Sequence, residues 1–284
     1  MQKYTIQNEI SLILEQLTPC YGEREAQALA NRIFDHLMDY RPVDVYMNKD
    51  QVVTEHVHTK IRSVIHELKR YRPVQYIFRE TWFYNLSFYV DESVLIPRPE
   101  TEELVQWVLN ENRHKTLSIL DIGTGSGCIA VSLAKNMLQC KVWAMDVSDE
   151  ILEIAMNNAD RNQTQIRTIK ADILDIPKHK EAFDLIVSNP PYIPGKEKHY
   201  MPENVKSYEP SRALFVPDQD PLVFYRAIAD FGKKHLKNGG SIYCELHENM
   251  SRKTKTVFES EGYAKVIVKQ DINGKSRMLR ALKE

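Results

Sequence analysis

The chain has 284 residues, of which 43% are hydrophobic and 27% charged, and its formal net charge is −1. Such a composition is typical of a globular protein with a main core and a second, smaller unit. It excludes a disordered chain and a strongly basic nucleic-acid binder, and no apolar run is long enough to span a membrane.

The ends of the chain and its cysteines predict a cytoplasmic protein. Residues 1–4 lack the apolar centre of a signal peptide. Cys20, Cys128, Cys140 and Cys244 are scattered and form no C-x-x-C motif, so we expect reduced thiols. The nine histidines form no H-E-x-x-H motif, and we expect no metal site.

Residues 1–74 predict a small, all-helical domain. Between Glu23 and Met38 the apolar residues recur at helical spacing, and a second such pattern lies between Ile61 and Leu68. Residues 1–75 contain ten Lys or Arg and ten Asp or Glu, so their charges cancel. This balance favours contacts with a protein surface over contacts with phosphates, and we expect the domain to recognise a protein substrate.

Residues 75–95 predict a β-hairpin that links this domain to the next. Tyr76–Phe78 and Thr81–Val90 are rich in aromatic and β-prone residues, and Asn85 marks a possible turn. The following segment, Ile96–Glu102, reads I-P-R-P-E-T-E. On physical grounds it could be only a rigid entry to a helix, with Thr101 as a candidate N-cap, or it could take part in binding a substrate or cofactor.

A glycine-rich loop follows the next predicted strand, 117–120. The loop reads D-I-G-T-G-S-G from Asp121 to Gly127, and an apolar helix is expected from Cys128 to about Leu138. Alternate glycines allow close approach of the backbone to a ligand, and the helix N-terminus offers free N–H groups. The spacing G-x-G-x-G differs from the dinucleotide fingerprint G-x-G-x-x-G.

Two aspartates end the next two predicted strands. Asp146 follows the strand 141–145 and is placed to bind ribose hydroxyls, while Asp172 follows the strand 166–170 and could reach an adenine edge. Each Asp alone is a weak signal, because an Asp after a strand is commonly a helix cap.

The tetrapeptide Asn189-Pro190-Pro191-Tyr192 ends a fourth predicted strand, 183–187. Two prolines cannot continue the ladder, so the chain must break there into a stiff loop. The Asn oxygen and a Pro carbonyl can accept both N–H bonds of a planar amino group, and the Tyr ring can stack on its plane. Such a loop turns the lone pair of a poor nitrogen nucleophile toward an electrophile.

Strands and helices alternate from Thr101 to the C-terminus, as a doubly wound α/β sheet requires. A helix is expected after Pro221, a strand at Ser241–Glu245, and two strands at 263–270 and 276–282. Asn273-Gly274 predicts an antiparallel hairpin between these last two strands.

The order of loop, acid, acid and NPPY resembles the class I S-adenosylmethionine-dependent methyltransferases. This resemblance implies a Rossmann-like methyltransferase domain at residues 96–284 with a terminal antiparallel hairpin. NPPY alone does not choose among DNA adenine, RNA guanine and protein glutamine methylation.

Residues 96–102 resemble the I-P-R-P-[DE]-T-E signature of the protein-(glutamine-N5) methyltransferases that act on peptide-chain release factors. Segments after NPPY, Glu245, and the hairpin segment 271–277 are also similar to that family. Arg79 and Asn85 depart from glycines often found in the linking hairpin, and Val216-Pro217 stands where the family often has Gly-Gly.

The family resemblance implies methyl transfer from S-adenosylmethionine to the glutamine N5 in a Gly-Gly-Gln motif of a release factor. It implies three groups of site residues. The catalytic residues would be Asn189, Pro190 and Tyr192, and Pro191 and Arg98 would join them in binding the substrate. The cofactor-binding residues would be Gly123, Thr124, Gly125, Ser126, Gly127, Asp146, Asp172, Ile173 and Asn189.

Two points stay open at this level. Arg98 could bind the carboxylate of the cofactor or pair with a nearby acid. The alternative function is a DNA or RNA exocyclic-amine methyltransferase, which would need a basic recognition surface that residues 1–75 do not show. We therefore expect release factors as partners and no direct DNA or membrane binding.

Overall fold

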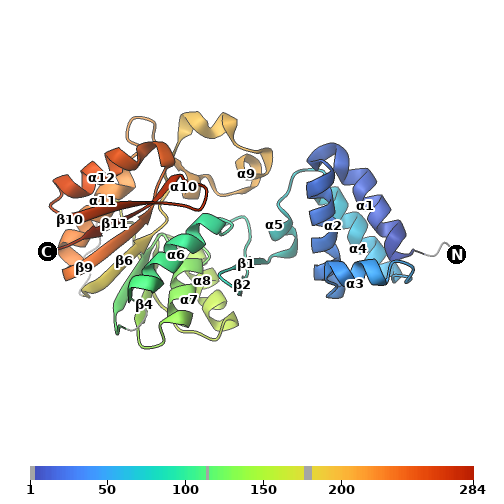
Figure 1. Cartoon of the computed structure of the whole chain (residues 1–284), viewed down its shortest axis with the longest axis horizontal. Coiled ribbons are helices and arrows are strands. Elements are labelled where there is room, and N and C mark those ends of the chain that lie inside the picture. The colour runs from blue at the N-terminus through green and yellow to red at the C-terminus, as the bar shows by residue number, and fades with distance from the viewer. Residues whose placement is uncertain (1–3, 113–114, 176–180) are drawn as a thin grey trace. The chain divides into compact units, whose positions relative to one another are not determined.

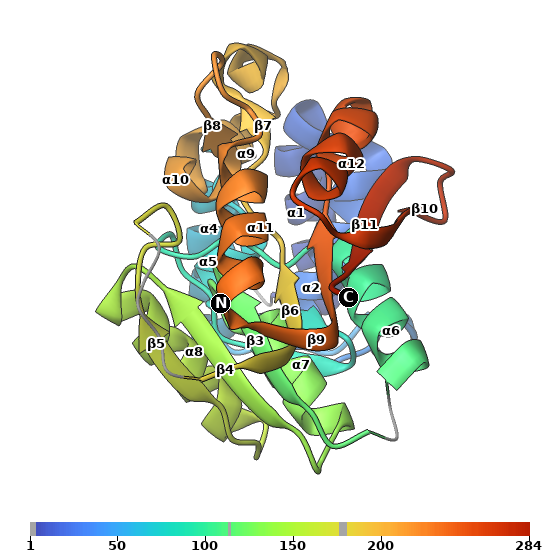
Figure 2. The ribbon, with the colours of Figure 1, turned by 90° about the vertical axis from the view of Figure 1, so that its left-hand side faces the viewer.

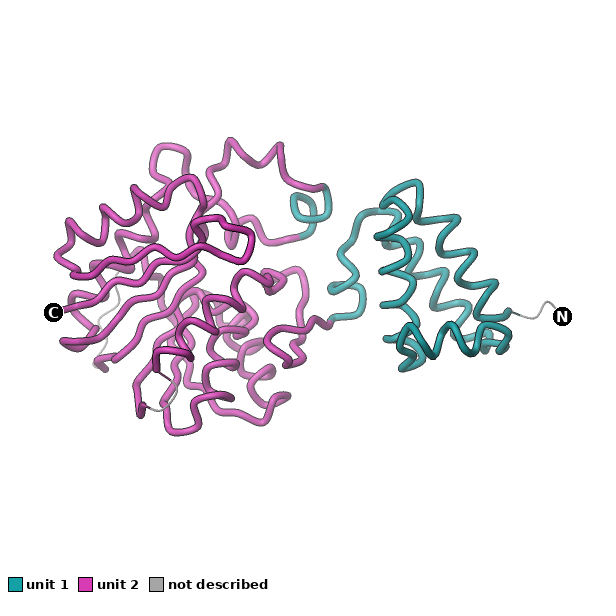
Figure 3. The backbone as a smooth tube through the Cα atoms, in the orientation of Figure 1, with its two compact units in different colours: residues 1–79, 203–208 teal, residues 80–202, 209–284 magenta. Residues whose placement is uncertain are grey.

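The computed structural model describes residues 4–112, 115–175 and 181–284. The chain divides into two compact units (Figure 3). Unit 1 comprises residues 1–79 and 203–208, and unit 2 comprises residues 80–202 and 209–284. In the described ranges, no helix combines the length and apolar character that a membrane crossing requires.

Unit 1 is a helical bundle around one apolar core. Thr5 caps the first helix by accepting a hydrogen bond from the Asn8 N–H, and Gly22, with φ of +77°, separates the first two helices. Buried residues such as Ile13, Ile33 and Ile65 come from three different helices. The helices are α1 (Ile6–Tyr21), α2 (Glu23–Met38), α3 (Pro42–Met47), α4 (Glu55–Leu68), α5 (Val74–Phe78) and α9 (Glu203–Tyr208).

Helix α9 is far from the rest of unit 1 in sequence, and Tyr208 fixes it there. The Tyr208 hydroxyl donates a hydrogen bond of 2.9 Å to the Arg70 carbonyl, 138 residues away. A segment that follows the NPPY loop in the chain therefore belongs to the helical unit, which a linear division into domains does not foresee.

The predicted linking hairpin is shorter than expected. Residues Tyr76–Phe78, assigned to the hairpin from their β-prone composition, are helical in α5. That prediction was wrong because the side chains of Ile77 and Phe78 pack against the apolar core of unit 1. The hairpin itself consists of β1 (Thr81–Phe83) and β2 (Leu86–Phe88), which are antiparallel.

Unit 2 is built on a seven-stranded sheet of order β10-β11-β9-β6-β3-β4-β5 (Figures 1 and 2). Its strands β3, β4, β5, β6 and β9 are parallel, while β11 pairs antiparallel with both β9 and β10. The bounds are β3 (Ser118–Ile122), β4 (Lys141–Asp146), β5 (Arg167–Lys170), β6 (Phe183–Ser188), β9 (Leu236–Glu245), β10 (Ala264–Gln270) and β11 (Ser276–Leu282).

Helices cover both faces of this sheet. Alternate strand residues face opposite sides, so Ile119 and Leu185 join the core under α6 and α7, whereas Leu120 and Ile186 join the core under α11 and α12. Figure 2 shows these two helical layers on either side of the strands. The bounds are α6 (Pro99–Asn112), α7 (Cys128–Asn136), α8 (Asp149–Arg161), α11 (Val223–His235) and α12 (Ser251–Ser260).

Apart from Tyr76–Phe78, the predicted elements are confirmed within a few residues, with two further differences. Strand β9 begins at Leu236 rather than at Ser241, and its register against β6 shifts across Gly239 and Gly240. Thr101 is not the N-cap of α6, because that helix begins two residues earlier at Pro99. Short elements complete unit 2: β7 (Ile193–Pro194), η1 (Gly195–Tyr200), α10 (Ser211–Leu214), β8 (Phe215–Val216) and η2 (Glu248–Met250).

Candidate active site

Strand register brings the predicted site segments to one edge of the sheet. Ile122 pairs with Met145 on one side and with Ser188 on the other, and Ser188 pairs with Cys244. The next residue along each strand or loop is therefore at the same edge. These residues are Gly123, Asp146, Asn189 and Glu245. This edge is the carboxyl end of the parallel strands, where open α/β sheets bind ligands.

The glycine loop has the backbone that its sequence predicts. Gly123, Gly125 and Gly127 have φ of +71°, +53° and +81°, a region that L side chains rarely adopt. A Cβ on Gly127 would lie 3.0 Å from the Cβ of Ala155, so this glycine permits α8 to pack closely. A Cβ on Gly123 or Gly125 would meet no atom of the described residues within 4 Å.

Polar residues around the loop hold its shape. Thr124 donates to Asp121 at 2.7 Å, and the same carboxylate oxygen accepts from the Ala130 N–H at 3.2 Å. Asn158, which is fully buried, donates to the carbonyl of Ser126 at 2.8 Å. Burial raises the pKa of the Asp121 carboxyl to about 7. The loop is thus fixed from both ends by buried polar groups.

Two buried atoms of the loop have no hydrogen-bond partner among the described residues. They are Asp121 Oδ1 and Ser126 Oγ. Buried polar atoms without partners cost free energy unless something satisfies them. Both atoms are therefore suited to contact a bound polar molecule.

Asp146 lies against the glycine loop, whereas the hydrogen bond of Asp172 is made within its own turn. One Asp146 oxygen accepts from the Gly125 N–H at 3.1 Å, and the other accepts from the Val147 N–H at 2.8 Å. Burial raises the pKa of Asp146 above its usual value. Asp172 is exposed and accepts from the Leu174 N–H at 2.9 Å, while Ile173 beside it is buried.

The NPPY segment ends β6 and carries a chain of side-chain hydrogen bonds. Asn189 Nδ2 donates to Thr101 Oγ1 at 3.0 Å, and Thr101 Oγ1 donates to Glu245 Oε2 at 2.6 Å. The Tyr192 hydroxyl donates to the other oxygen, Glu245 Oε1, at 2.8 Å. Pro190 is buried and Pro191 is half-buried. Thr101 and Glu245 are 2% and 1% exposed, so this chain of bonds is shielded from water.

The ionisation of this cluster follows from burial. Burial raises the pKa of Glu245 above its usual value, while the hydrogen bonds from Thr101 and Tyr192 oppose that rise. Burial and the nearby Glu245 carboxylate raise the pKa of Tyr192 well above its usual value. Tyr192 therefore keeps its proton and acts as a donor.

Arg98 forms an ion pair in this structure. Its guanidinium lies 2.6 Å from Glu209 Oε1, and the Glu209 side chain is 1% exposed. Of the two sequence-level alternatives, pairing with an acid is the one observed. The second oxygen, Glu209 Oε2, has no hydrogen-bond partner among the described residues. The substrate-binding role of Arg98 stays a prediction.

Sequence reasoning assigned no site role to Asp121, Glu245 and Asn158, and it considered Thr101 only as a helix N-cap. Asp121 precedes the first glycine by two positions, and its place at a strand end beside the glycine loop could have indicated a role in the site. Glu245 was noted only as similar to a family acid, and Asn158 had no signal, because its partners Tyr89 and Ser126 lie 69 and 32 residues away.

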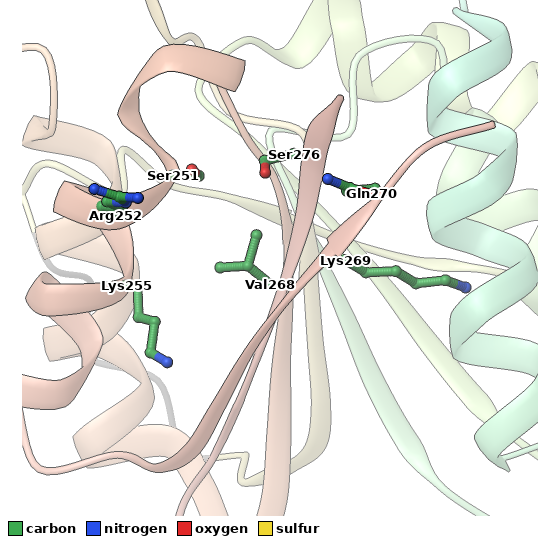
Figure 4. Close-up of a pocket in the computed structure, with 7 residues that line it drawn as sticks. All are labelled: Ser251, Arg252, Lys255, Val268, Lys269, Gln270 and Ser276. Atoms are coloured by element: carbon green, nitrogen blue, oxygen red, sulfur yellow. The ribbon is translucent and has the colours of Figure 1, made fainter. Parts of the chain in front are cut away.

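A separate hollow lies between α12 and the β10–β11 hairpin (Figure 4). No residue of the predicted site lines it. The residues that line the hollow are Ser251, Arg252, Lys255, Val268, Lys269, Gln270 and Ser276.

Among the described residues, no group of three or more His, Cys, Asp or Glu could hold a metal ion.

Two protein-family models match the chain. Residues 100–204 match the methyltransferase small domain, and residues 11–78 match the PrmC N-terminal domain. Among solved structures, the T. thermophilus 16S rRNA N2 G1207 methyltransferase RsmC, in complex with AdoMet and guanosine, is similar with a TM-score of 0.54 at 15% identity. The similarity covers 72% of this chain and 50% of that one. It supports the Rossmann-like class I methyltransferase fold.

Curated relatives match over nearly the whole chain. The release factor glutamine methyltransferase of Flavobacterium psychrophilum is 40% identical over 279 residues, which cover 97% of this chain and 98% of the relative. That of Bacteroides thetaiotaomicron is 40% identical over 276 residues, which cover 96% and 99%. With this identity over the full length of both relatives, the chain belongs to the family of release factor glutamine methyltransferases.

Proposed function

We propose that this chain methylates the side-chain amide nitrogen, N5, of the glutamine in the Gly-Gly-Gln motif of peptide-chain release factors. The methyl donor is S-adenosylmethionine. The family assignment supports the reaction. The observation that carries it in the structure is the alignment of the glycine loop, Asp146 and Asn189 at one sheet edge.

The residues of the glycine loop fit the cofactor. The left-handed backbone at Gly123 and Gly125 leaves space where a Cβ would stand, and Ser126 Oγ offers a buried polar atom without a partner. We assign the ribose to Asp146 and the adenine to Asp172 with Ile173. When bound, S-adenosylmethionine supplies an electrophilic methyl group on a positively charged sulfur.

Asn189, Pro190 and Tyr192 prepare the glutamine amide. An amide nitrogen is a poor nucleophile because its lone pair is delocalised into the carbonyl. Asn189 Oδ1 and the Pro190 carbonyl accept its two N–H bonds, and the Tyr192 ring packs on its face. Positioning supplies most of the catalysis. No strong base is needed beforehand, since the nitrogen becomes acidic only as it forms the new bond.

Unit 1 recognises the release factor outside the Gly-Gly-Gln motif. Apolar side chains are exposed on or just after α3, where Tyr46 is 73% exposed, Met47 72% and Val43 54%. Exposed apolar groups that gather in one segment mark interaction surfaces more often than isolated ones do. We place this reaction in the cytoplasm, where translation terminates.

Tritiated methyl transfer tests the substrate. Purified release factors, DNA and RNA are offered in parallel to the wild-type enzyme, and mass spectrometry locates the label. We expect label on the Gly-Gly-Gln glutamine of release factors only. Label on nucleic acid with none on release factors would replace this function by the exocyclic-amine alternative.

The role of unit 1 is tested with Tyr46→Ser combined with Met47→Ser. This variant should lower kcat/KM for an intact release factor by roughly thirtyfold, because each of the two truncated interface anchors costs about 1 kcal/mol. Its kcat/KM for a short Gly-Gly-Gln peptide should stay at the wild-type value. Leu138→Ser, at an 88% exposed position in unit 2, is the matched control. Equal losses on both substrates would refute recognition by this segment.

A further inference from the structure

The Asn189 amide works as an acceptor in only one of its two orientations. With Oδ1 toward the substrate it accepts an N–H bond, and with the amide flipped it presents its own N–H donors to another donor. The flip moves no other atom of the side chain, so something must choose between the two orientations. Among the described residues, Asn189 Oδ1 has no hydrogen-bond partner, whereas Nδ2 donates to Thr101 Oγ1.

Thr101 can select one orientation of the Asn189 amide because its own hydroxyl proton already forms a hydrogen bond with Glu245. A hydroxyl has one proton to donate, and Thr101 donates it to Glu245 Oε2 at 2.6 Å. Its lone pairs are then left to accept from Asn189 Nδ2 at 3.0 Å. A flipped Asn189 would bring two acceptor oxygens to that distance with no proton between them, which is repulsive.

Glu245 determines the direction in which hydrogen bonds are donated along this chain, from Asn189 to Thr101 and from Thr101 to Glu245. Both of its oxygens accept, one from Thr101 and the other from Tyr192. Its side chain is buried, and the Tyr225 hydroxyl donates to its backbone carbonyl at 3.0 Å, which leaves both side-chain oxygens to Thr101 and Tyr192. An ionised carboxylate has no proton to donate, so the direction of the chain of bonds cannot reverse while Glu245 is ionised.

We propose that Glu245, acting through Thr101, fixes the Asn189 amide with its oxygen toward the substrate glutamine, and that the same carboxylate anchors Tyr192. Thr101 and Glu245 are thus positioning residues for methyl transfer and do not touch the reacting atoms. This inference rests on the proposed role of Asn189 as an acceptor.

Three substitutions test the direction of the chain. Thr101→Val removes the hydroxyl at nearly constant volume and should lower kcat roughly tenfold, the effect of one lost hydrogen bond. Thr101→Ser keeps the hydroxyl and should restore kcat to within about threefold of wild type. Glu245→Gln should cost more than Thr101→Val, because a Gln N–H donated to Thr101 frees the Thr101 proton to bind Asn189 Oδ1.

A double-mutant cycle separates orientation from mere structural support. Asp at position 189 has two equivalent oxygens and no N–H to donate to Thr101, so Thr101 has no orientation to select in this background. In the Asn189→Asp background, Thr101→Val should therefore lower kcat by less than about twofold. A structural role of Thr101 would produce the same loss in both backgrounds, and that result would overturn the proposal.

Matched controls complete the experiment. Tyr225→Phe removes a hydroxyl that binds the Glu245 backbone rather than its side chain, and it should keep the wild-type kcat. Circular dichroism and calorimetric affinity for S-adenosylhomocysteine should match wild type in the variants of Thr101, Glu245 and Tyr225. If Thr101→Val does not fold, Glu245→Gln with the Asn189→Asp cycle carries the test.

The outcome also separates this inference from the proposed function. Wild-type turnover in Asn189→Ala would refute the acceptor role itself. Loss of turnover in Asn189→Ala, together with wild-type kcat in both Thr101→Val and Glu245→Gln, would refute only the orientation by Thr101 and Glu245.

Discussion

The glycine loop and the Asn189 cluster lie at the same sheet edge, yet they are built in opposite ways. The loop owes its shape mainly to backbone angles within seven consecutive residues, Asp121–Gly127, to which Asp146 and Asn158 add two hydrogen bonds from outside the loop. The cluster owes its shape to side chains, with Thr101 contacting residues 88 and 144 positions away. One half of the site is therefore encoded locally, and the other half exists only after folding.

This difference separates binding from turnover. A backbone loop fits a ligand in the ground state and the transition state alike, which is uniform binding. A cluster that orients an amide acts mainly when the new bond forms. The following predictions test that separation, beginning with the largest effect.

Asn189→Ala and Asp146→Ala should have opposite kinetic signatures. Asn189→Ala should lower kcat by roughly 10²–10³-fold, as removed transition-state hydrogen-bond partners do elsewhere, with cofactor affinity within about tenfold of wild type. Asp146→Ala should weaken cofactor affinity and leave kcat near wild type at saturating cofactor. Steady-state kinetics and calorimetry measure both. Similar signatures for the two variants would remove the distinction between the halves.

Gly127→Ala should destabilise the fold by roughly 2–5 kcal/mol, the sum of left-handed strain and overpacking. The new Cβ would lie 3.0 Å from Ala155 Cβ, and Gly127 has φ of +81°. Gly262→Ala is the control, since it has φ of +87° but no described atom within 4 Å of its Cβ. Urea unfolding compares them. Equal losses would mean that close packing on α8 contributes nothing.

Stability of the cofactor-free protein should depend on the protonation of Asp121. Its pKa is about 7 in the fold and 3.8 for the reference carboxyl, so protonation favours the folded state. This stabilisation is fully present below pH 3.8 and is lost as the pH rises to about 7. The total loss is at most about 4 kcal/mol, because a difference of one in pKa between the folded and unfolded states corresponds to about 1.36 kcal/mol. Asp121→Asn should lack this component, as urea unfolding at a series of pH values will show. A constant difference between variant and wild type across that range would contradict the assignment.

Arg79→Gly should stabilise the protein slightly. Arg79 and Asn85, which stand where the family often has glycines in the linking hairpin, have φ of +52° and +59°, so both are left-handed without glycine. Arg79→Gly should gain about 0.5–1 kcal/mol, the relief of strain less the entropy of glycine in the unfolded chain. Asn85→Gly should change stability less, because Asn tolerates this conformation. Arg79→Ala, which keeps the strain, should show no gain in thermal unfolding.

The order of elements, the sheet and the glycine loop could be predicted from the amino-acid sequence. Local periodicity and turn residues carry that information, because a strand end, a proline pair or an Asn-Gly turn acts on its immediate neighbours. The prediction failed at Tyr76–Phe78, where packing in unit 1 overrode β propensity. The family resemblance supplied the substrate, which no spacing of residues could give.

The partners that hold the Asn189 amide could not be predicted in this way, because they come together only in the folded protein. The pairing of Ile122 with Ser188, and of Ser188 with Cys244, places Asn189 beside Glu245, and α6 then brings Thr101 between them. The fold likewise pairs Arg98 with Glu209 across 111 residues. Hydrogen bonds between distant side chains depend on register and helix packing. The residue types are written in the sequence, but their partners are set by the fold.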